Sequence, residues 1–176
     1  MRSTADALQL FEKSVERYLF ELEDLTMEQL LAAPNEEEWS IGQMFVHLIQ
    51  STHYMLRNVE QCLAGGDDVT GVTKGKTEDG KALFELGSFP PIRIKVPASS
   101  YTTPQPEGKE QLIEGLRDVL ERMKRIERVL NQAPDGNKAI HPKFGALNAK
   151  EWFLLVEMHF RHHFLQLERL LNVLEK

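Results

Sequence analysis

The sequence predicts an all-α fold: a four-helix bundle, formed as a single domain by residues 1–176, with a long crossover between its second and third helices. Four segments carry apolar residues at the spacing of one helix face. Capping residues, glycines and prolines mark where several of these segments begin and end. Residues 64–106, rich in Gly, Pro, Ser and Thr, separate the second segment from the third. Two neighbouring helices that run in the same direction need such a crossover.

The first two helices are predicted over Thr4 to Asp24 and from Ser40 to the glycine pair Gly65-Gly66. Ser40 and Gln43 have the spacing of a capping box, and the glycine pair is typical of a helix end. Apolar stripes identify the buried faces, and their members are Leu8, Phe11, Val15, Tyr18, Leu19 and Leu22 in the first helix and Ile41, Met44, Leu48, Ser51 and Met55 in the second.

The last two helices are predicted over Lys109 to Gln132 and after Asn148. The third has apolar residues at alternating steps of four and three, which is the seam of a helix bundle. Asn148 and Glu151 form a second capping pair. The stripes comprise Leu112, Leu116, Val119, Met123, Ile126 and Leu130 in the third helix and Trp152, Leu155, Val156, Leu167, Leu170 and Leu174 in the fourth.

Composition narrows the classes of partner. The net charge is −6 and the chain offers no basic face, which argues against nucleic acid and against anionic membranes. No apolar run approaches the length of a membrane span, and the N-terminal residues lack the apolar core of a signal peptide. The single cysteine, Cys62, cannot form an internal disulfide. A cytoplasmic protein is therefore expected.

The placement of the histidines carries the functional signal. His159 and His163 lie one helical turn apart in the middle of the fourth apolar stripe, a spacing that suits two ligands of one metal ion. His47 falls at the inner margin of the second helix. The other three are expected elsewhere: His53 facing solvent, His162 at the edge of the core face and His141 in a loop.

Spacing alone leaves two interpretations open. The inward histidines either bind a shared metal or form a hydrogen-bonded polar network in the core, because a buried imidazole needs a partner. A zincin-type mechanism is excluded, since Phe160-Arg161-His162 separate the pair and the glutamate of that motif is missing.

Two motifs resemble those of the DinB/YfiT-like superfamily. They are Trp39-Ser40-Ile41-Gly42-Gln43 followed by His47-Leu48, and His141-Pro142-Lys143-Phe144-Gly145 followed by Asn148, Glu151-Trp152 and His159-Phe160-Arg161-His162-His163. The resemblance implies a four-helix bundle with a long crossover. It also implies a metal site formed by His47, His159 and His163. The ion is typically zinc or nickel and sometimes iron or manganese, and relatives of this kind tend to form homodimers.

The resemblance further implies a reaction class. Its better-understood members are transferases and isomerases that use low-molecular-weight thiols such as bacillithiol or mycothiol, although many members have no known reaction. We therefore expect a metal-dependent transferase acting on small electrophiles with such a thiol. The alternatives are a metal-dependent hydrolase, a non-catalytic metal-binding protein and a purely structural bundle. No catalytic residue is assigned.

Several residues are expected to support the site. Gln166 and Ser51, each within one helical turn of a predicted ligand, are candidate hydrogen-bond partners of the imidazoles, or else polar residues at the core margin. Trp39 and Trp152 are expected to be core anchors. In the crossover, Phe89, Pro90, Pro91 and Tyr101 are expected to cover the metal, and Ile92 to Val96 alternate in polarity as a short extended piece would.

For several charged residues and for the remaining histidines, the sequence predicts a role less specifically. Arg93 and Lys95 either recognise an acidic thiol or are solvated, and the run Glu36-Glu37-Glu38 is expected to be solvated. His141 is expected to fix the loop that enters the fourth helix, and His162 to be partly exposed.

Overall fold

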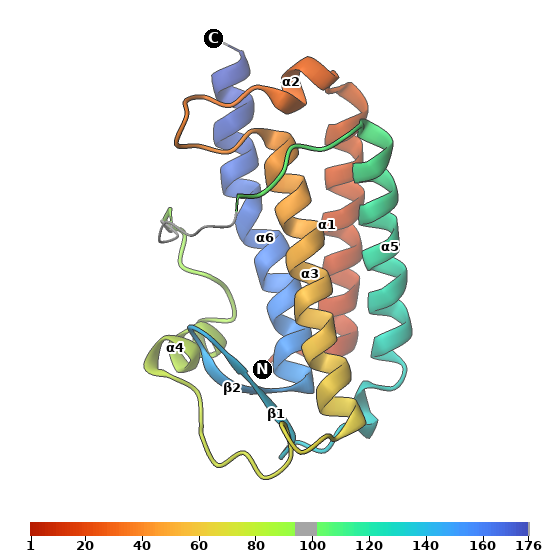
Figure 1. The fold of residues 1–176 in the computed structure, drawn as a ribbon, viewed down its shortest axis with the longest axis vertical. Coiled ribbons are helices and arrows are strands. Elements are labelled where there is room, and N and C mark those ends of the chain that lie inside the picture. Colours follow the sequence, from red (N-terminus) through yellow and green to blue (C-terminus); the bar gives the residue numbers. More distant parts are fainter. Residues whose placement is uncertain (94–101, 176) are drawn as a thin grey trace.

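The fold is mostly helical, which confirms the predicted fold class at that level. The computed structural model describes residues 1–93 and 102–175. In this part of the chain, four long helices lie side by side: α1 (Thr4–Asp24), α3 (Ile41–Ala64), α5 (Lys109–Glu127) and α6 (Ala149–Leu174) (Figure 1). Each of them packs against two of the others. The N-terminus lies at the hairpin end of these helices and the C-terminus at the opposite end.

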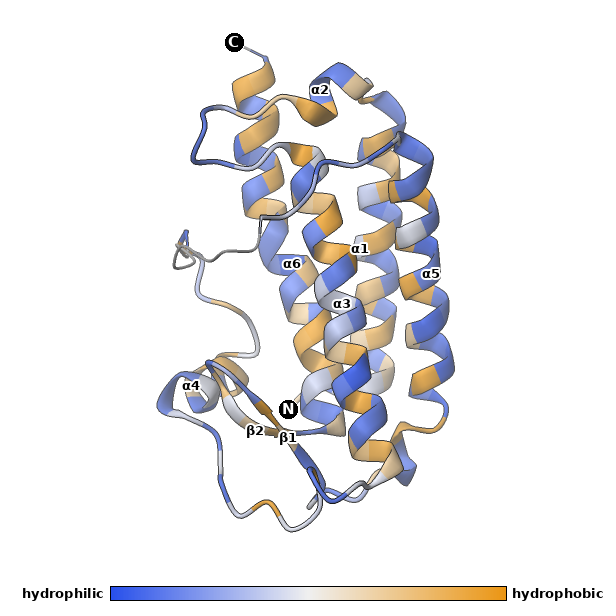
Figure 2. Cartoon of the chain, viewed as in Figure 1, coloured by the Kyte–Doolittle hydropathy of each residue, from blue (hydrophilic) through white to orange (hydrophobic). Residues whose placement is uncertain are grey.

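The core lies between the four helices. Its largest fully buried side chains include Phe11, Tyr18, Phe45, Trp152 and Phe160. Apolar and hydrophilic residues alternate along every long helix (Figure 2), as expected for helices that bury one face. No helix among the described residues is both long and apolar enough to span a membrane.

The residues predicted to cap the helices do so in the structure. Ser40 caps α3 and Asn148 caps α6, each in a complete capping box with Gln43 and Glu151 respectively. Gly65 ends α3 in the left-handed conformation, with φ of 72°. These caps satisfy backbone groups at the helix ends and fix the register of the two helices that carry the inward histidines.

One helix boundary and one short helix differ from the prediction. The helix predicted over Lys109 to Gln132 ends at Glu127, and a 3₁₀ turn, η1 (Leu130–Gln132), follows it. This turn still buries Leu130. The apolar pattern therefore continues past the end of the helix, and periodicity alone predicts a helix that is too long. A short helix, α2 (Met27–Leu31), was also missed, although Thr26 and Gln29 form its capping box.

The segment between α3 and α5 contains more structure than expected. Helix α4 (Glu78–Leu86) begins after the N-cap Thr77 and ends at Gly87, which has φ of 72°. The surrounding glycines and charged residues hid this helix from the sequence analysis. Of the predicted extended piece, Ile94, Lys95 and Val96 lie outside the described residues, as do Pro97 and Tyr101.

A hairpin leads into α6. Strands β1 (Lys138–His141) and β2 (Gly145–Asn148) are antiparallel, with His141 opposite Gly145. His141 therefore ends a strand, and its expected place in a loop is wrong. Gly145 has φ of 83°, and a Cβ there would lie 2.7 Å from the carbonyl oxygen of Gly75. The glycine thus lets the segment before α4 dock against the hairpin.

Candidate metal centre

Three imidazole rings meet between α3 and α6. His47 comes from α3, and His159 and His163 come from α6. The Nε2 atom of His159 lies 3.1 Å from Nε2 of His47 and 3.0 Å from Nε2 of His163. One ligand atom from each ring lies within 4.8 Å of the others. These three residues, called the histidine centre below, are brought together as the sequence analysis expected.

The backbone of α6 is held in place beside this centre. The Tyr18 hydroxyl donates a hydrogen bond of 2.6 Å to the carbonyl oxygen of Phe160, the residue after His159. The Tyr18 ring also stacks on Phe164, with centroids 4.1 Å apart. Because both contacts are buried, they fix the height of α6 relative to α1 and hence the position of the two histidines on α6.

Burial keeps the three rings neutral near pH 7. It lowers the pKa of His47 to about 4 and, with a contribution from His47, that of His163 to about 3. The pKa of His159 lies well below its ordinary value, first because of burial and then because the neighbouring imidazoles disfavour another positive charge. Neutral imidazoles carry the lone pairs that metal coordination requires.

Two rings have oxygen partners at the nitrogen facing away from the centre. Nδ1 of His163 lies 2.7 Å from Oε1 of Gln166, and Nδ1 of His47 lies 3.3 Å from the Ser51 hydroxyl. The structure thus places both predicted partners on the expected rings. When Nδ1–H of His163 donates to the amide oxygen, its Nε2 carries the lone pair and faces the centre.

This arrangement fits a cation better than a hydrogen-bonded network. With both partner oxygens accepting, Nε2 of His47 and Nε2 of His163 are both acceptors. His159 has a single Nε2, which carries at most one proton and cannot satisfy both. One divalent cation would accept all three lone pairs at once. The described part of the chain offers Nδ1 of His159 no hydrogen-bond partner, so no contact at that atom orients the ring.

Two aromatic side chains border the histidine centre. The Trp39 ring lies 4.7 Å from the His47 ring, and the Phe89 ring lies 6.2 Å from the His159 ring. Trp39 is half-buried, so its expected role as a core anchor is wrong, whereas Trp152 is fully buried as expected. Phe89, in contrast, lies beside the site as predicted, since its ring is near that of His159.

The Phe89 segment is tied to α6. Arg161 donates a hydrogen bond of 2.8 Å to the carbonyl oxygen of Gly87, at the end of α4. The same guanidinium pairs with the buried carboxylate of Glu157. Pro90 and Pro91, which were also expected over the metal, are exposed.

The comparison with family models decides the classification. The model of the DinB superfamily matches residues 10–167, which is most of the chain and includes all three residues of the histidine centre. The chain belongs to the DinB superfamily. Comparison with curated proteins yields no match.

The remaining histidines of this DinB protein have other surroundings. Nδ1 of His141 accepts hydrogen bonds from the backbone N–H groups of Lys143 and Phe144, at 3.0 and 3.1 Å, and so fixes the turn before α6. His162 is half-buried against Phe89, with ring centroids 5.1 Å apart. His53 was expected to face solvent, but it is half-buried and accepts from Arg122 of α5 at 2.7 Å.

One polar feature of the DinB protein was missed by the sequence analysis. Glu38, expected to be solvated, pairs with Arg93 at 2.9 Å and with Arg169 at 2.7 Å. These three residues, called the rim cluster below, are far apart in the sequence. No motif in the sequence predicts these ion pairs, because the three residues come together only in the folded chain.

Proposed function

We propose that this DinB protein binds one divalent metal ion through Nε2 of His47, His159 and His163. Imidazole ligands suit several divalent metals, and the resemblance to DinB/YfiT-like proteins favours zinc or nickel, with iron or manganese as alternatives. We also propose that α1, α3, α5 and α6 form the four-helix bundle with a long crossover that is typical of such proteins. The observation that carries the proposal is the convergence of three neutral imidazoles, two of them oriented by Gln166 and Ser51.

We further propose that the centre activates a low-molecular-weight thiol, such as bacillithiol, for transfer to a small electrophile. Three protein ligands leave a coordination position open, which is the pattern of catalytic rather than structural sites. A bound divalent ion would supply stabilisation of a thiolate at neutral pH. The chain's own part is to hold three imidazoles in fixed orientation and to exclude water with Trp39 and Phe89.

The proposed transfer is a substitution. The thiol gives its proton to solvent, its sulfur forms a bond to an electrophilic carbon, and the leaving group departs with the electron pair of the broken bond. No oxidant or reductant takes part. The aromatic surroundings of the site support an apolar electrophile, because such walls bind apolar groups and orient them.

The test uses untagged protein that has been stripped with a chelator and reloaded with zinc or nickel. We expect about one ion per chain, since the site offers one set of ligands. Conjugation of bacillithiol to monochlorobimane should then be faster with reloaded than with stripped protein. His53→Ala, which changes a histidine outside the centre, should behave as the wild type.

Two results would overturn parts of this proposal. Less than about a tenth of an equivalent of metal after reloading would exclude the metal site, because a three-imidazole site retains its ion. Metal binding without conjugation of any of several thiols would exclude the transferase and leave hydrolysis or a binding role. A cytoplasmic location and a homodimer stay predictions.

A further inference from the structure

We propose that the rim cluster, Glu38, Arg93 and Arg169, binds a carboxylate of the substrate whose reactive group reaches the histidine centre. This inference rests on the proposed function and names the substrate class of the same site: a small thiol that carries a carboxylate. It is carried by the geometry of the cluster, its position and its charge.

The cluster holds two guanidinium groups on opposite oxygens of one carboxylate. Oε1 of Glu38 pairs with Arg93 at 2.9 Å, and Oε2 pairs with Arg169 at 2.7 Å. The Glu38 side chain is only 15% exposed, whereas Arg93 and Arg169 are 54% and 36% exposed. Each guanidinium has five N–H donors, so donors remain on the exposed side of both.

Two members of the cluster adjoin residues that touch the histidine centre. Glu38 directly precedes Trp39, whose ring lies 4.7 Å from the ring of His47. Arg169 lies on α6 one turn beyond Gln166, the partner of His163. Residues three apart on a helix lie on the same face, so the Arg169 side chain leaves α6 next to Gln166.

The third member arrives from the crossover. Arg93 lies four residues beyond Phe89, which packs 6.2 Å from the ring of His159. The residues between α4 and Arg93 lie on the α6 side of the four long helices (Figure 1). Three separate parts of the chain therefore each bring one group to the histidine centre and one charge to the cluster. We infer from these three links that the cluster lies at the rim of the centre.

The charge of the cluster is opposite in sign to the net charge of the chain. The hydrogen bond from Arg169, together with that from Arg93, lowers the pKa of the Glu38 carboxyl, so the cluster carries two positive charges and one negative charge. The chain as a whole carries −6. An acidic surface repels an anionic substrate, and a net positive group beside the site would counter that repulsion and orient the anion.

The experiment compares two thiols that differ in one group, 3-mercaptopropionate and 3-mercapto-1-propanol. Each is titrated into cobalt-substituted protein, and the dissociation constant is read from the thiolate-to-cobalt absorption band in the near ultraviolet. The wild type should bind the carboxylate thiol roughly tenfold more tightly, as expected for a hydrogen-bonded charge pair. The preference should shrink as salt is added, because the rim is exposed.

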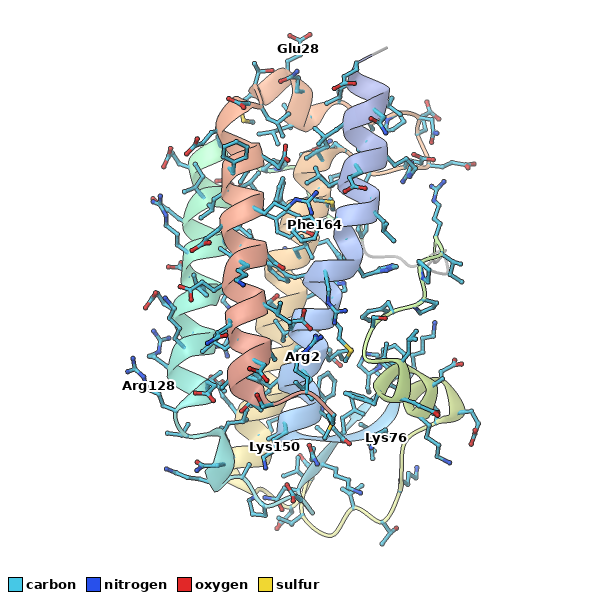
Figure 3. All side chains as sticks on the ribbon, turned by 180° about the vertical axis from the view of Figure 1, so that it is seen from behind. Arg2, Glu28, Lys76, Arg128, Lys150 and Phe164 are labelled. Carbon is cyan, nitrogen blue, oxygen red and sulfur yellow. The ribbon has the colours of Figure 1, made fainter. Side chains whose placement is uncertain are left out.

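Substitutions in the cluster should remove this preference. Arg93→Gln and Arg169→Gln should weaken binding of 3-mercaptopropionate while leaving binding of 3-mercapto-1-propanol unchanged. Arg169→Lys should retain part of the preference, since it keeps the charge and loses the planar fork. The matched control is Arg128→Gln, which removes one positive charge from an exposed residue at the end of α5, away from α6 (Figure 3).

The outcomes separate this inference from the proposed function. Equal affinity of the wild type for both thiols, with the absorption band present, would overturn the carboxylate site and leave the thiol function intact. A preference that survives in both glutamine variants would also overturn it, because the cluster would then only fasten the crossover to α6. Absence of the band with either thiol would overturn the proposed function and this inference with it.

Discussion

Two histidines on α3, six residues apart, show what distinguishes a candidate ligand from a structural histidine. Burial lowers the pKa of both His47 and His53. His53 accepts a hydrogen bond from Arg122, which also pairs with Glu60 at 2.8 Å. A guanidinium donates hydrogen bonds and carries a positive charge. It therefore occupies the lone pair of the His53 imidazole and repels a metal cation.

His47 faces a different set of neighbours. Its Nδ1 meets an oxygen of Ser51, and its Nε2 points at Nε2 of His159. The Nε2 lone pairs of the histidine centre repel one another where no proton lies between them, and a bound cation would remove that repulsion. Partner chemistry, rather than burial or the residue type, therefore separates the histidine centre from the His53 surroundings.

The largest expected effect tests this comparison directly. His159→Ala should lower the affinity for zinc by roughly 100-fold or more, since it removes the ring between the other two ligands and loss of a mere supporting partner already costs 10–100-fold. His53→Ala should leave the affinity unchanged. Competition with a chromophoric chelator measures both. Equal losses in the two variants would show that the histidine centre is not the metal site.

The metal-free protein should show a pH dependence that originates in the same centre. The pKa of His47 is about 4 in the folded chain and 6.5 as its ordinary value. Between these values the unfolded chain binds a proton that the folded chain does not, so stability is lost as pH falls from 6.5 toward 4. The His47 shift corresponds to about 3 kcal/mol.

Urea unfolding in the presence of a chelator measures this effect. The decrease in unfolding free energy between pH 7 and pH 4.5 should be smaller in His47→Ala than in the wild type. His53→Ala should change it less, because the pKa of His53 is lowered by a smaller amount. A decrease of the same size in His47→Ala and the wild type would contradict the neutral, buried state of the centre.

The sequence predicts local features of this protein better than long-range ones. The caps at Ser40 and Asn148 and the histidine pair one turn apart depend on neighbours within four residues, and the structure has them as predicted. The hairpin before α6 was missed because its strands are four residues each, too short for alternation to stand out. Helix α4 lies between stretches rich in glycine, which obscured it.

Contacts between distant segments were beyond the reach of periodicity. The projection of α3 turned His53 away from the histidine centre, but it could not show that Arg122 of α5 would half-bury the ring. Trp39 precedes its helix, so no helical face assigned it to the site. Glu38 was interpreted from its acidic neighbours, whereas its partners lie 55 and 131 residues away in the chain.

The smallest expected effects distinguish the two oxygen partners of the centre. Gln166→Ala should weaken zinc binding about 10-fold or more, because it removes the acceptor that orients His163 at 2.7 Å. Ser51→Ala should weaken it less, since the hydroxyl lies 3.3 Å from Nδ1 of His47 and its contact is longer and weaker than that of Gln166. Gln166→Glu keeps an acceptor at that place and should retain most of the affinity. A larger loss in Ser51→Ala than in Gln166→Ala would mean that His47, rather than His163, depends on its partner for orientation. The difference between His47 and His53 would then come from Ser51 as much as from the absence of a guanidinium beside His47.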